Sequence, residues 1–228
     1  MGIERQAKVA RSGRARRAGR WAMLVAGLML WPPGSAWAGA PTDQLRASVD
    51  RVIRVLEDPA LRPEARTAER RAAIRREANQ IFDFEETAKR ALGRHWQELT
   101  EADRREFVAL FADLLEHAYV SKIERYSGEK IVYAGDSAEG EGARVKTRFV
   151  TAKGEDIPVE YRMRRRDDRW LVYDVNVEGV SLVASYRSQF DRIIRSSSYR
   201  DLVARMKSRQ DGFTAPGGSG DRAGAPRS

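Results

Sequence analysis

The sequence predicts an α+β domain in which N-terminal helices pack on a curled antiparallel sheet of four strands, with a helix after the sheet. Apolar residues recur at helical spacing from residue 42 to residue 126, and the period changes to two between residues 130 and 177. A helical period returns at residues 186–207. Runs of helices followed by runs of strands are typical of α+β folds, whereas α/β folds alternate the two.

The first 38 residues have the three-part layout of a cleavable secretion signal. A basic stretch, Arg5–Arg20, precedes an apolar run of 11 residues, Trp21–Trp31, which prolines then interrupt. Ala36-Trp37-Ala38 is a small-x-small pattern that places the cut after Ala38. The apolar run is shorter than the roughly 20 residues that a membrane-spanning helix needs. We therefore expect export and cleavage; the alternative is a short N-terminal anchor that stays uncut.

The net charge of +9 comes mostly from this N-terminal segment. Residues 1–38 contain seven Lys or Arg and one Glu, so the rest of the chain carries +3. A charge this small does not indicate a nucleic-acid partner. The chain has no cysteine, which excludes disulfides and a cysteine nucleophile. We expect a monomeric domain at residues 39–209, large enough to need no disulfides, and a disordered tail rich in Gly, Pro, Ser and Ala at residues 210–228.

Four helices are expected before the sheet, at residues 42–58, 63–82, 83–93 and 100–126. Asp83 is expected to cap the third helix, because acidic residues follow it in the first turn. Thr100 is expected to cap the fourth, since Asp103 follows at the capping-box spacing. The fourth helix carries an apolar stripe along its length, which predicts that this face is buried.

Four strands are expected, at residues 130–134, 144–151, 156–165 and 170–177, with turns at residues 135–142, 153–154 and 166–168. The last three strands alternate apolar and polar side chains, as strands with one buried face do. On the fourth strand, the alternation places Leu171, Tyr173, Val175 and Val177 on the apolar face. One continuous helix is expected after the sheet, at residues 186–207.

Residue types that carry catalysis or bind metals are sparse in this sequence. His95 and His117 are the only histidines, and no His or Cys pair has the spacing of a metal site. The sequence contains no phosphate-binding loop and no nucleophilic serine elbow. We therefore expect no cofactor and no metal, and we expect both histidines to have structural roles.

Asp174, Asn176 and Glu178 alternate on one face of the fourth expected strand. One interpretation is an acidic cluster that transfers protons in a small pocket. The other is a set of hydrogen bonds to neighbouring loops and helix ends. The second interpretation is favoured, because no basic or electrophilic partner converges on these residues in the sequence.

Several blocks of the chain resemble the MlaC (toluene-tolerance) family. The most specific block is Trp170-Leu171-Val172-Tyr173-Asp174-Val175, followed by residues 178–183 and 186–190. Earlier resembling blocks lie at residues 82–93 with Trp96, at positions within 99–115, and at residues 126–130 and 157–162. The resemblance covers about residues 43–208.

This resemblance implies a periplasmic phospholipid-binding protein of Gram-negative bacteria, with a cone-shaped fold related to nuclear transport factors and no enzymatic activity. Such proteins carry lipid between an outer-membrane lipoprotein complex and an inner-membrane ABC transporter complex, which maintains the lipid asymmetry of the outer membrane. Three alternatives stay open: a polycyclic, hopanoid-type lipid as the cargo, a non-catalytic adaptor that binds only protein, and an enzyme built on the same cone.

An apolar interior that holds the lipid is expected from the alternation of the strands and the stripe of the long helix. The candidate lipid-binding residues are Phe111, Leu115 and Tyr119 from the long helix, Val145, Phe149, Val159, Tyr161, Met163, Tyr173, Val175 and Val177 from the sheet, and Tyr186 and Phe190 from the last helix. The alternative for each is ordinary core packing. Arg162, Arg164, Arg165 and Arg187 are candidates for binding the lipid phosphate, since guanidinium groups bind phosphate in a bidentate manner; the alternative is a solvated basic surface.

Overall fold

The computed structural model describes residues 40–208 and Phe213, all within the second of two compact units, Ser35–Ser228. The expected signal at residues 1–38 lies outside the described residues, and so does the expected disordered tail except for Phe213. The ring of Phe213 lies 5.8 Å from that of Phe190 in an edge-on contact, so this one tail residue packs against the domain.

The helices before the sheet form where the sequence predicts them. They are α1 (Ala40–Glu57), η1 (Glu64–Arg66), α2 (Thr67–Ile81), α3 (Phe84–Leu92), η2 (Gly93–Glu98) and α4 (Glu101–Glu124), where η denotes a 3-10 helix. Asp83 caps α3, because its side chain accepts a hydrogen bond from the backbone N–H of Glu86 at 3.0 Å. Thr100 caps α4 in the same way, accepting from the N–H of Asp103 at 3.2 Å. Both predicted caps are confirmed.

The strands form one antiparallel meander in chain order. They are β1 (Lys130–Glu139), β2 (Gly142–Val150), β3 (Asp156–Arg166), β4 (Arg169–Val177) and β5 (Val180–Ser181). The fifth strand was not predicted, since two residues are too short to show a period. β1 continues five residues beyond its predicted end, because a bulge between Tyr133 and Gly135 interrupts the alternation but not the pairing with β2.

A second bulge lies on β4 and changes which side chains share a face. Arg162 pairs with Asp174 and Met163 pairs with Val172, so Tyr173 is an extra residue without a partner on β3. Val175 and Val177 therefore share a face with Val172. The prediction that Tyr173 lies on that face is wrong, because its ring stacks on the guanidinium of Arg90 in α3, 4.2 Å away. Leu171 is likewise on the other face.

The chain after the sheet forms two helices, α5 (Leu182–Ser196) and α6 (Tyr199–Lys207), so the prediction of one continuous helix is wrong. The hydroxyls of Ser196 and Ser197 both donate to the carbonyl of Ile193 at the end of α5. Ser198 then accepts from the N–H of Asp201 and begins α6 as its cap. Consecutive serines compete with helical backbone bonds in this way, which ends one helix and starts the next.

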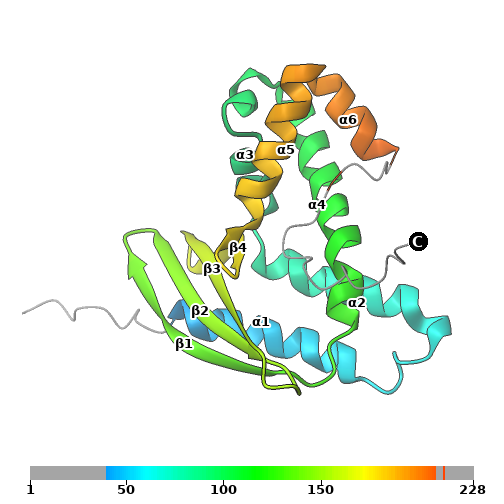
Figure 1. The fold of residues 1–228 in the computed structure, drawn as a ribbon, viewed down its shortest axis with the longest axis vertical. Coiled ribbons are helices and arrows are strands. Elements are labelled where there is room, and N and C mark those ends of the chain that lie inside the picture. The colour runs from blue at the N-terminus through cyan, green and yellow to red at the C-terminus, as the bar shows by residue number, and fades with distance from the viewer. Residues whose placement is uncertain (1–39, 209–212, 214–228) are drawn as a thin grey trace, which may run out of the picture. The chain divides into compact units, whose positions relative to one another are not determined.

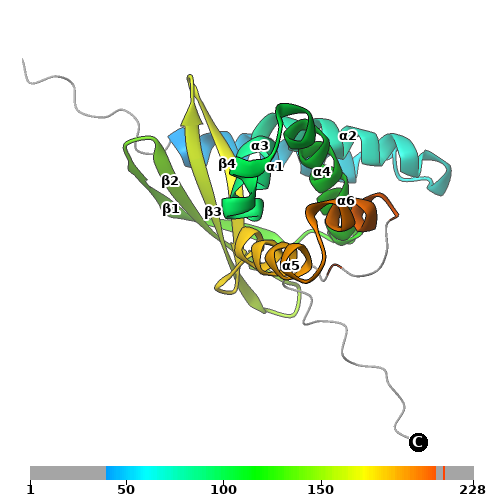
Figure 2. The same cartoon turned by 90° about the horizontal axis from the view of Figure 1, so that it is seen from above.

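The buried residues form two separate clusters. The helical cluster joins α3, η2, α4, α5 and α6 through Ala88, Ala91, Leu92, Trp96, Phe107, Phe111, Val183, Tyr186, Phe190, Leu202 and Met206. The sheet cluster joins α1 and the end of α2 to one face of the sheet through Leu45, Ile81, Ala143, Val145, Met163, Trp170 and Val172. We call this face of the sheet the inner face. Figures 1 and 2 show α1 beside the sheet and the helices α3 to α6 grouped beyond β4.

Strand β4 connects the two clusters through side-chain and backbone hydrogen bonds. The N–H of Asp83 donates to Val172 O at 2.8 Å, and the hydroxyl of Thr87 donates to Tyr173 O at 3.0 Å, which fixes the start of α3. The buried carboxylate of Asp174 accepts from Ser181 Oγ at 2.7 Å and from the N–H of Val183 at 3.0 Å, which fixes the start of α5. Both helices are thus oriented by the strand that carries the bulge.

Ion pairs connect α2 to the C-terminal end of α4. The carboxylate of Glu124 accepts from Arg70 at 3.0 Å and from Arg71 at 2.8 Å, and Arg75 pairs with Glu116 at 2.5 Å. The hydrogen bond from Arg71, more than that from Arg70, holds the pKa of Glu124 below its ordinary value. Since the folded pKa is depressed, these pairs stabilise the fold at neutral pH, and the stabilisation disappears as the pH falls through the folded pKa.

We expect Glu124→Gln to lower the free energy of unfolding at pH 7 by about 1 kcal/mol, a modest value because Arg71 is half exposed. The difference between the variant and the unaltered protein should narrow as the pH falls through the lowered pKa of the native carboxylate, where that group gains its proton. Urea unfolding at several pH values measures the loss of stability at pH 7 and its change with pH. A difference that stays constant from pH 7 to pH 3 would show that the ionised carboxylate does not stabilise the fold.

Candidate functional site

The burial of the inner face falls from one end of the sheet to the other. At one end, Val145, Met163 and Val172 are fully buried by α1 and the end of α2. At the other end, Phe149 and Val177 are only half-buried, although they lie on the same face. The inner face is apolar along most of its length, and the helices bury one end of it more completely than the other. We call the less buried end the open end.

The C-terminal half of α1 passes the open end of the sheet. The guanidinium of Arg46 lies over the ring of Tyr133 at 4.5 Å, which places the middle of α1 beside β1. Burial raises the pKa of the Tyr126 phenol, and the nearby carboxylate of Glu57 raises it further. Helix α1 therefore runs from the sheet cluster, against which Val49 packs, towards the start of β1, which pairs with the part of β2 that holds Phe149.

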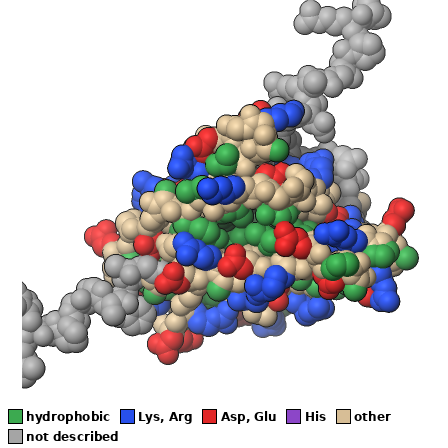
Figure 3. Space-filling model, turned by 90° about the horizontal axis from the view of Figure 1, so that it is seen from below, with side chains coloured by type: hydrophobic (Ala, Val, Ile, Leu, Met, Phe, Trp, Pro, Cys, Tyr) green, Lys and Arg blue, Asp and Glu red, His purple; other side chains and the backbone are tan. Residues whose placement is uncertain are grey.

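Apolar residues that are half-buried and belong to neither cluster occur on the C-terminal half of α1 and at the open end of the sheet. We call them the apolar hollow and define it by Val52, Ile53 and Leu56 of α1 and Phe149, Ile157 and Val177 of the sheet, all half-buried and all outside both clusters. Figure 3 shows apolar side chains in a hollow at the centre of one face, with Lys, Arg, Asp and Glu around it. Apolar surface that is enclosed by polar residues in this way is typical of a ligand-binding groove.

Helix α4 places two further candidates, Leu115 and Tyr119, beside the helical cluster. Leu115 is half-buried against the helical cluster, and Tyr119 lies one turn further along the helix. Burial, and secondarily the nearby phenol of Tyr186, raises the pKa of Tyr119. Burial also raises the pKa of Tyr186 to about 12, so both phenols are neutral at physiological pH.

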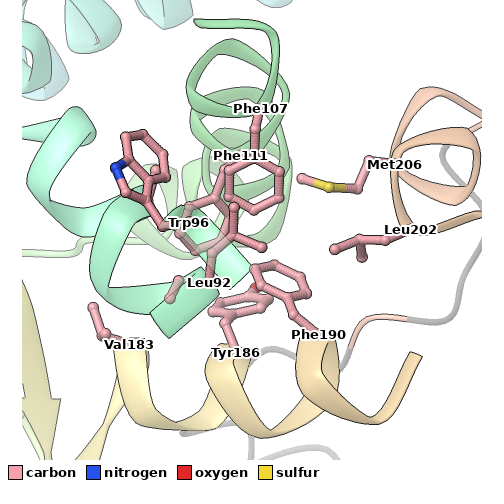
Figure 4. Packing of buried hydrophobic residues seen from close by; sticks show 11 residues of the cluster. Leu92, Trp96, Phe107, Phe111, Val183, Tyr186, Phe190, Leu202 and Met206 are labelled. Atoms are coloured by element: carbon pink, nitrogen blue, oxygen red, sulfur yellow. The ribbon is translucent and has the colours of Figure 1, made fainter. Parts of the chain in front are cut away.

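Three of the candidate lipid-binding residues pack tightly in the helical cluster. Phe111, Tyr186 and Phe190 are at most 1% exposed, and their rings lie 5.2 to 5.6 Å apart. Figure 4 shows Tyr186 and Phe190 extending from α5 towards Phe111 of α4. Such edge-on aromatic contacts contribute stability beyond burial alone. The packing fits the core alternative for these residues, and a contact with lipid stays a prediction.

The candidates on the inner face of the sheet divide between the sheet cluster and the apolar hollow, except for Val159. Val145 and Met163 belong to the sheet cluster, and Tyr161 and Val175 pack against it. Val159 is 8% exposed and pairs directly with Val177. The α1 residues of the hollow were not among the candidates, although the apolar spacing of Val52 and Leu56 in the sequence was a signal for them.

The arginines expected at a lipid phosphate have partners within the protein. Arg164 pairs with Glu86 at 2.8 Å, and Arg162 lies 3.5 Å from both Glu160 and Asp174. Arg187 donates through Nε to the carbonyl of Arg90 at 2.7 Å. These bonds give each guanidinium a fixed position, and a role at the lipid phosphate stays a prediction.

The hydrogen bonds of Asp174 fit the structural interpretation of the acidic residues, because the carboxylate binds the first turn of α5. The two histidines also have partners within the fold. His95 Nε2 lies 2.9 Å from Asp191, and His117 Nδ1 lies 2.9 Å from Asp113 O. Among residues 40–208 and Phe213, no group of three or more His, Cys, Asp or Glu side chains could hold a metal ion.

We expect Asp174→Asn to lower the free energy of unfolding by about 1–2 kcal/mol, since asparagine can keep one acceptor of the cap but loses the charge beside Arg162. Uptake of phospholipid from vesicles should be unchanged. Thermal unfolding and a vesicle uptake assay measure the two effects. A folded variant that no longer takes up lipid would contradict a purely structural role for Asp174.

Comparisons of the sequence with known proteins identify one family. The family model described as "MlaC protein" matches residues 46–208. The chain is 21% identical over 143 residues to the intermembrane phospholipid transport system binding protein MlaC of Haemophilus influenzae. That match covers 60% of this chain and 66% of the relative, just under two thirds of its length.

A solved structure has the same fold. It is a phospholipid-binding protein from Ralstonia solanacearum in complex with a phospholipid, with a TM-score of 0.61 and 23% sequence identity. The match covers 73% of this chain and 94% of that one. In the part of this chain that the structure describes, no helix has both the length and the apolar character to cross a membrane.

Proposed function

Since this chain belongs to the MlaC family, we propose that it is a periplasmic carrier that holds a phospholipid by its acyl chains in the apolar hollow. The observation that carries the proposal is the apolar inner face of the sheet, which α1 and α2 cover at one end and leave half-buried at the other. The acyl chains would contact Phe149, Ile157 and Val177 from the sheet and the C-terminal half of α1.

The energetics of lipid transfer explain why such a carrier needs a hollow and no catalytic group. Moving one methylene group from an apolar environment into water costs about 0.8 kcal/mol. An acyl chain of about 15 methylenes therefore costs on the order of 12 kcal/mol, and two chains cost about twice that. Spontaneous escape against such a barrier is slow. A protein that shields the chains lowers the barrier by binding alone.

The partners of the carrier follow from the family and from the sequence. The expected secretion signal would deliver the domain to the periplasm. The Haemophilus relative is named as the binding protein of an intermembrane phospholipid transport system. We propose that this chain likewise exchanges lipid with an inner-membrane ABC transporter complex and an outer-membrane lipoprotein complex, and so maintains outer-membrane lipid asymmetry.

A vesicle experiment tests the proposal. Delipidated protein is mixed with vesicles that contain a fluorescent phosphatidylethanolamine, and the protein is then separated and its bound lipid is measured. We expect saturable uptake that approaches one lipid per protein. Absence of uptake, with the protein folded by circular dichroism, would exclude the phospholipid carrier and leave the polycyclic-lipid carrier, the protein-binding adaptor and the enzyme.

A further inference from the structure

One buried hydroxyl on the inner face of the sheet has no partner within the protein. Among the described residues, the buried side-chain atoms without a hydrogen-bond partner are Thr42 Oγ1, Asp83 Oδ2, Tyr133 Oη, Trp170 Nε1 and Tyr186 Oη. Tyr133 lies on the inner face, since it packs against the sheet cluster. Buried polar side chains are almost always hydrogen-bonded, so a hydroxyl without a protein partner points to a ligand or an ordered water.

The register of the sheet places Tyr133 beside the apolar hollow. Tyr133 pairs with Thr147 on β2, and Thr147 pairs with Val159 on β3. Val159 pairs in turn with Val177 of the hollow, so one row across the inner face joins Tyr133 to it. Phe149 of the hollow lies two residues after Thr147 on the same strand, which makes it a diagonal neighbour of Tyr133.

Two other hydroxyls on this part of the inner face already have partners. Thr147 Oγ1 donates to the carbonyl of Val159 at 3.1 Å. Burial raises the pKa of Tyr161, and a hydrogen bond with Thr147 lowers it by less. The phenol of Tyr133 is near enough to Tyr161 to raise that pKa as well, yet no hydrogen bond joins the two. Tyr133 therefore adds a free donor at the border of the hollow.

Helix α1 fixes the ring of Tyr133 and sets the kind of group that its hydroxyl can bind. The guanidinium of Arg46 lies over the ring at 4.5 Å. Burial, and secondarily the carboxylate of Asp50, raises the pKa of Tyr133 to about 12, although Arg46 lowers it. The phenol thus keeps its proton at physiological pH and can donate it. Arg46 and Asp50 carry opposite charges, so the surroundings favour a neutral acceptor over a phosphate.

We propose that Tyr133 Oη donates a hydrogen bond to an ester carbonyl of the phospholipid whose acyl chains occupy the apolar hollow. This inference rests on the proposed function and adds the glycerol-ester region of the lipid to it. The ester carbonyl is a neutral acceptor at the root of each acyl chain, so it enters apolar surroundings together with the chain. Tyr133 as a whole is half-buried and stands on the edge strand β1, which leaves the attached head group within reach of water.

The test compares an ester lipid with an ether lipid in matched variants. Tyr133→Phe removes the hydroxyl and keeps the ring beneath Arg46. Tyr173→Phe is the control, because the ring of Tyr173 also stacks on a guanidinium, that of Arg90 at 4.2 Å, but lies on the other face of the sheet. Delipidated proteins compete for a fluorescent phosphatidylethanolamine with dipalmitoyl phosphatidylethanolamine or with its dihexadecyl ether analogue, which has the same head group and no ester carbonyl.

We expect the unaltered protein and the Tyr173 variant to bind the ester lipid about fivefold or more tightly than the ether lipid. The Tyr133 variant should bind both lipids equally, at the level of the ether lipid. Its Tm should not fall, because the lost hydroxyl has no bond within the protein.

Two results would overturn the assignment of Tyr133 while leaving the carrier intact. One is equal binding of the two lipids by the unaltered protein, which would mean that the hydroxyl binds only water. The other is an ester preference that survives in the Tyr133 variant. Binding of neither lipid by the folded, unaltered protein would instead contradict the proposed function, and the inference with it.

Discussion

Replacing Val177 with tryptophan is expected to reduce phospholipid uptake about tenfold or more while the domain stays folded. Val177 is half-buried on the inner face and pairs with Val159 at the open end of the sheet. The larger ring would occupy the space that we assign to an acyl chain. Because the position lies outside both buried clusters, the cost in folding stability should stay within the about 1–3 kcal/mol that overpacking causes.

The matched control for this change is Leu171→Trp. Leu171 is a half-buried residue on the same strand, and its side chain lies on the opposite face of the sheet. The control also adds a large ring to β4 but outside the hollow, so lipid uptake should match that of the unaltered protein. Uptake is measured with fluorescent lipid in vesicles and folding by circular dichroism. Normal uptake by the Val177 variant would refute our assignment of the hollow.

Phe190→Ala is expected to lower the free energy of unfolding by about 3–5 kcal/mol. Phe190 is fully buried, and its ring contacts those of Phe107, Phe111 and Tyr186 in the helical cluster. Truncation removes the centre of this aromatic group and leaves a cavity that the surrounding helices cannot fill without moving. Urea denaturation measures the change.

An exposed apolar residue provides the comparison for Phe190. Ile123 on α4 is 38% exposed, so Ile123→Ala should change stability by less than about 1 kcal/mol. The Phe190 result also separates the two roles considered for that residue. A loss of only about 1 kcal/mol, together with loss of lipid uptake, would mean that Phe190 lines a lipid site and does not hold the helical cluster together.

The sequence predicts the helices and long strands well because local signals define them. Asp83 and Thr100 are caps with acidic residues at the expected positions, and both form the expected bonds. The strand alternation also holds for β2, where alternate residues from Ala143 to Thr147 are buried. These features depend on neighbours in the sequence, which is why they can be inferred without the fold.

The faces of β4 could not be predicted, because the bulge at Tyr173 depends on distant residues. Its carbonyl accepts from Thr87, and its ring meets Arg90, both on α3. These contacts stabilise an extra residue in the strand and reverse the alternation that the sequence shows. The error moved Tyr173 into the expected lipid site and left Val172 out of the inner face.

The division of the interior into two clusters could not be predicted from the sequence either. The apolar stripes of α4 and of the strands look alike, so Phe111 and Val145 were expected to face one interior. In the fold they belong to different clusters, since α3 and α5 attach to β4 and place the aromatic group away from the inner face. The packing of helices, and not the period of either element, decides which apolar residues remain half-buried.

The central claim is that the chain carries a phospholipid, and the lipid that accompanies the purified protein tests it most directly. The mature domain is purified from the periplasm without detergent, and the bound lipid is identified by mass spectrometry under native and then denaturing conditions. We predict a diacyl phospholipid that is released only on denaturation. A polycyclic hydrocarbon in its place, or a protein that holds no lipid and takes up none from vesicles, would contradict the claim.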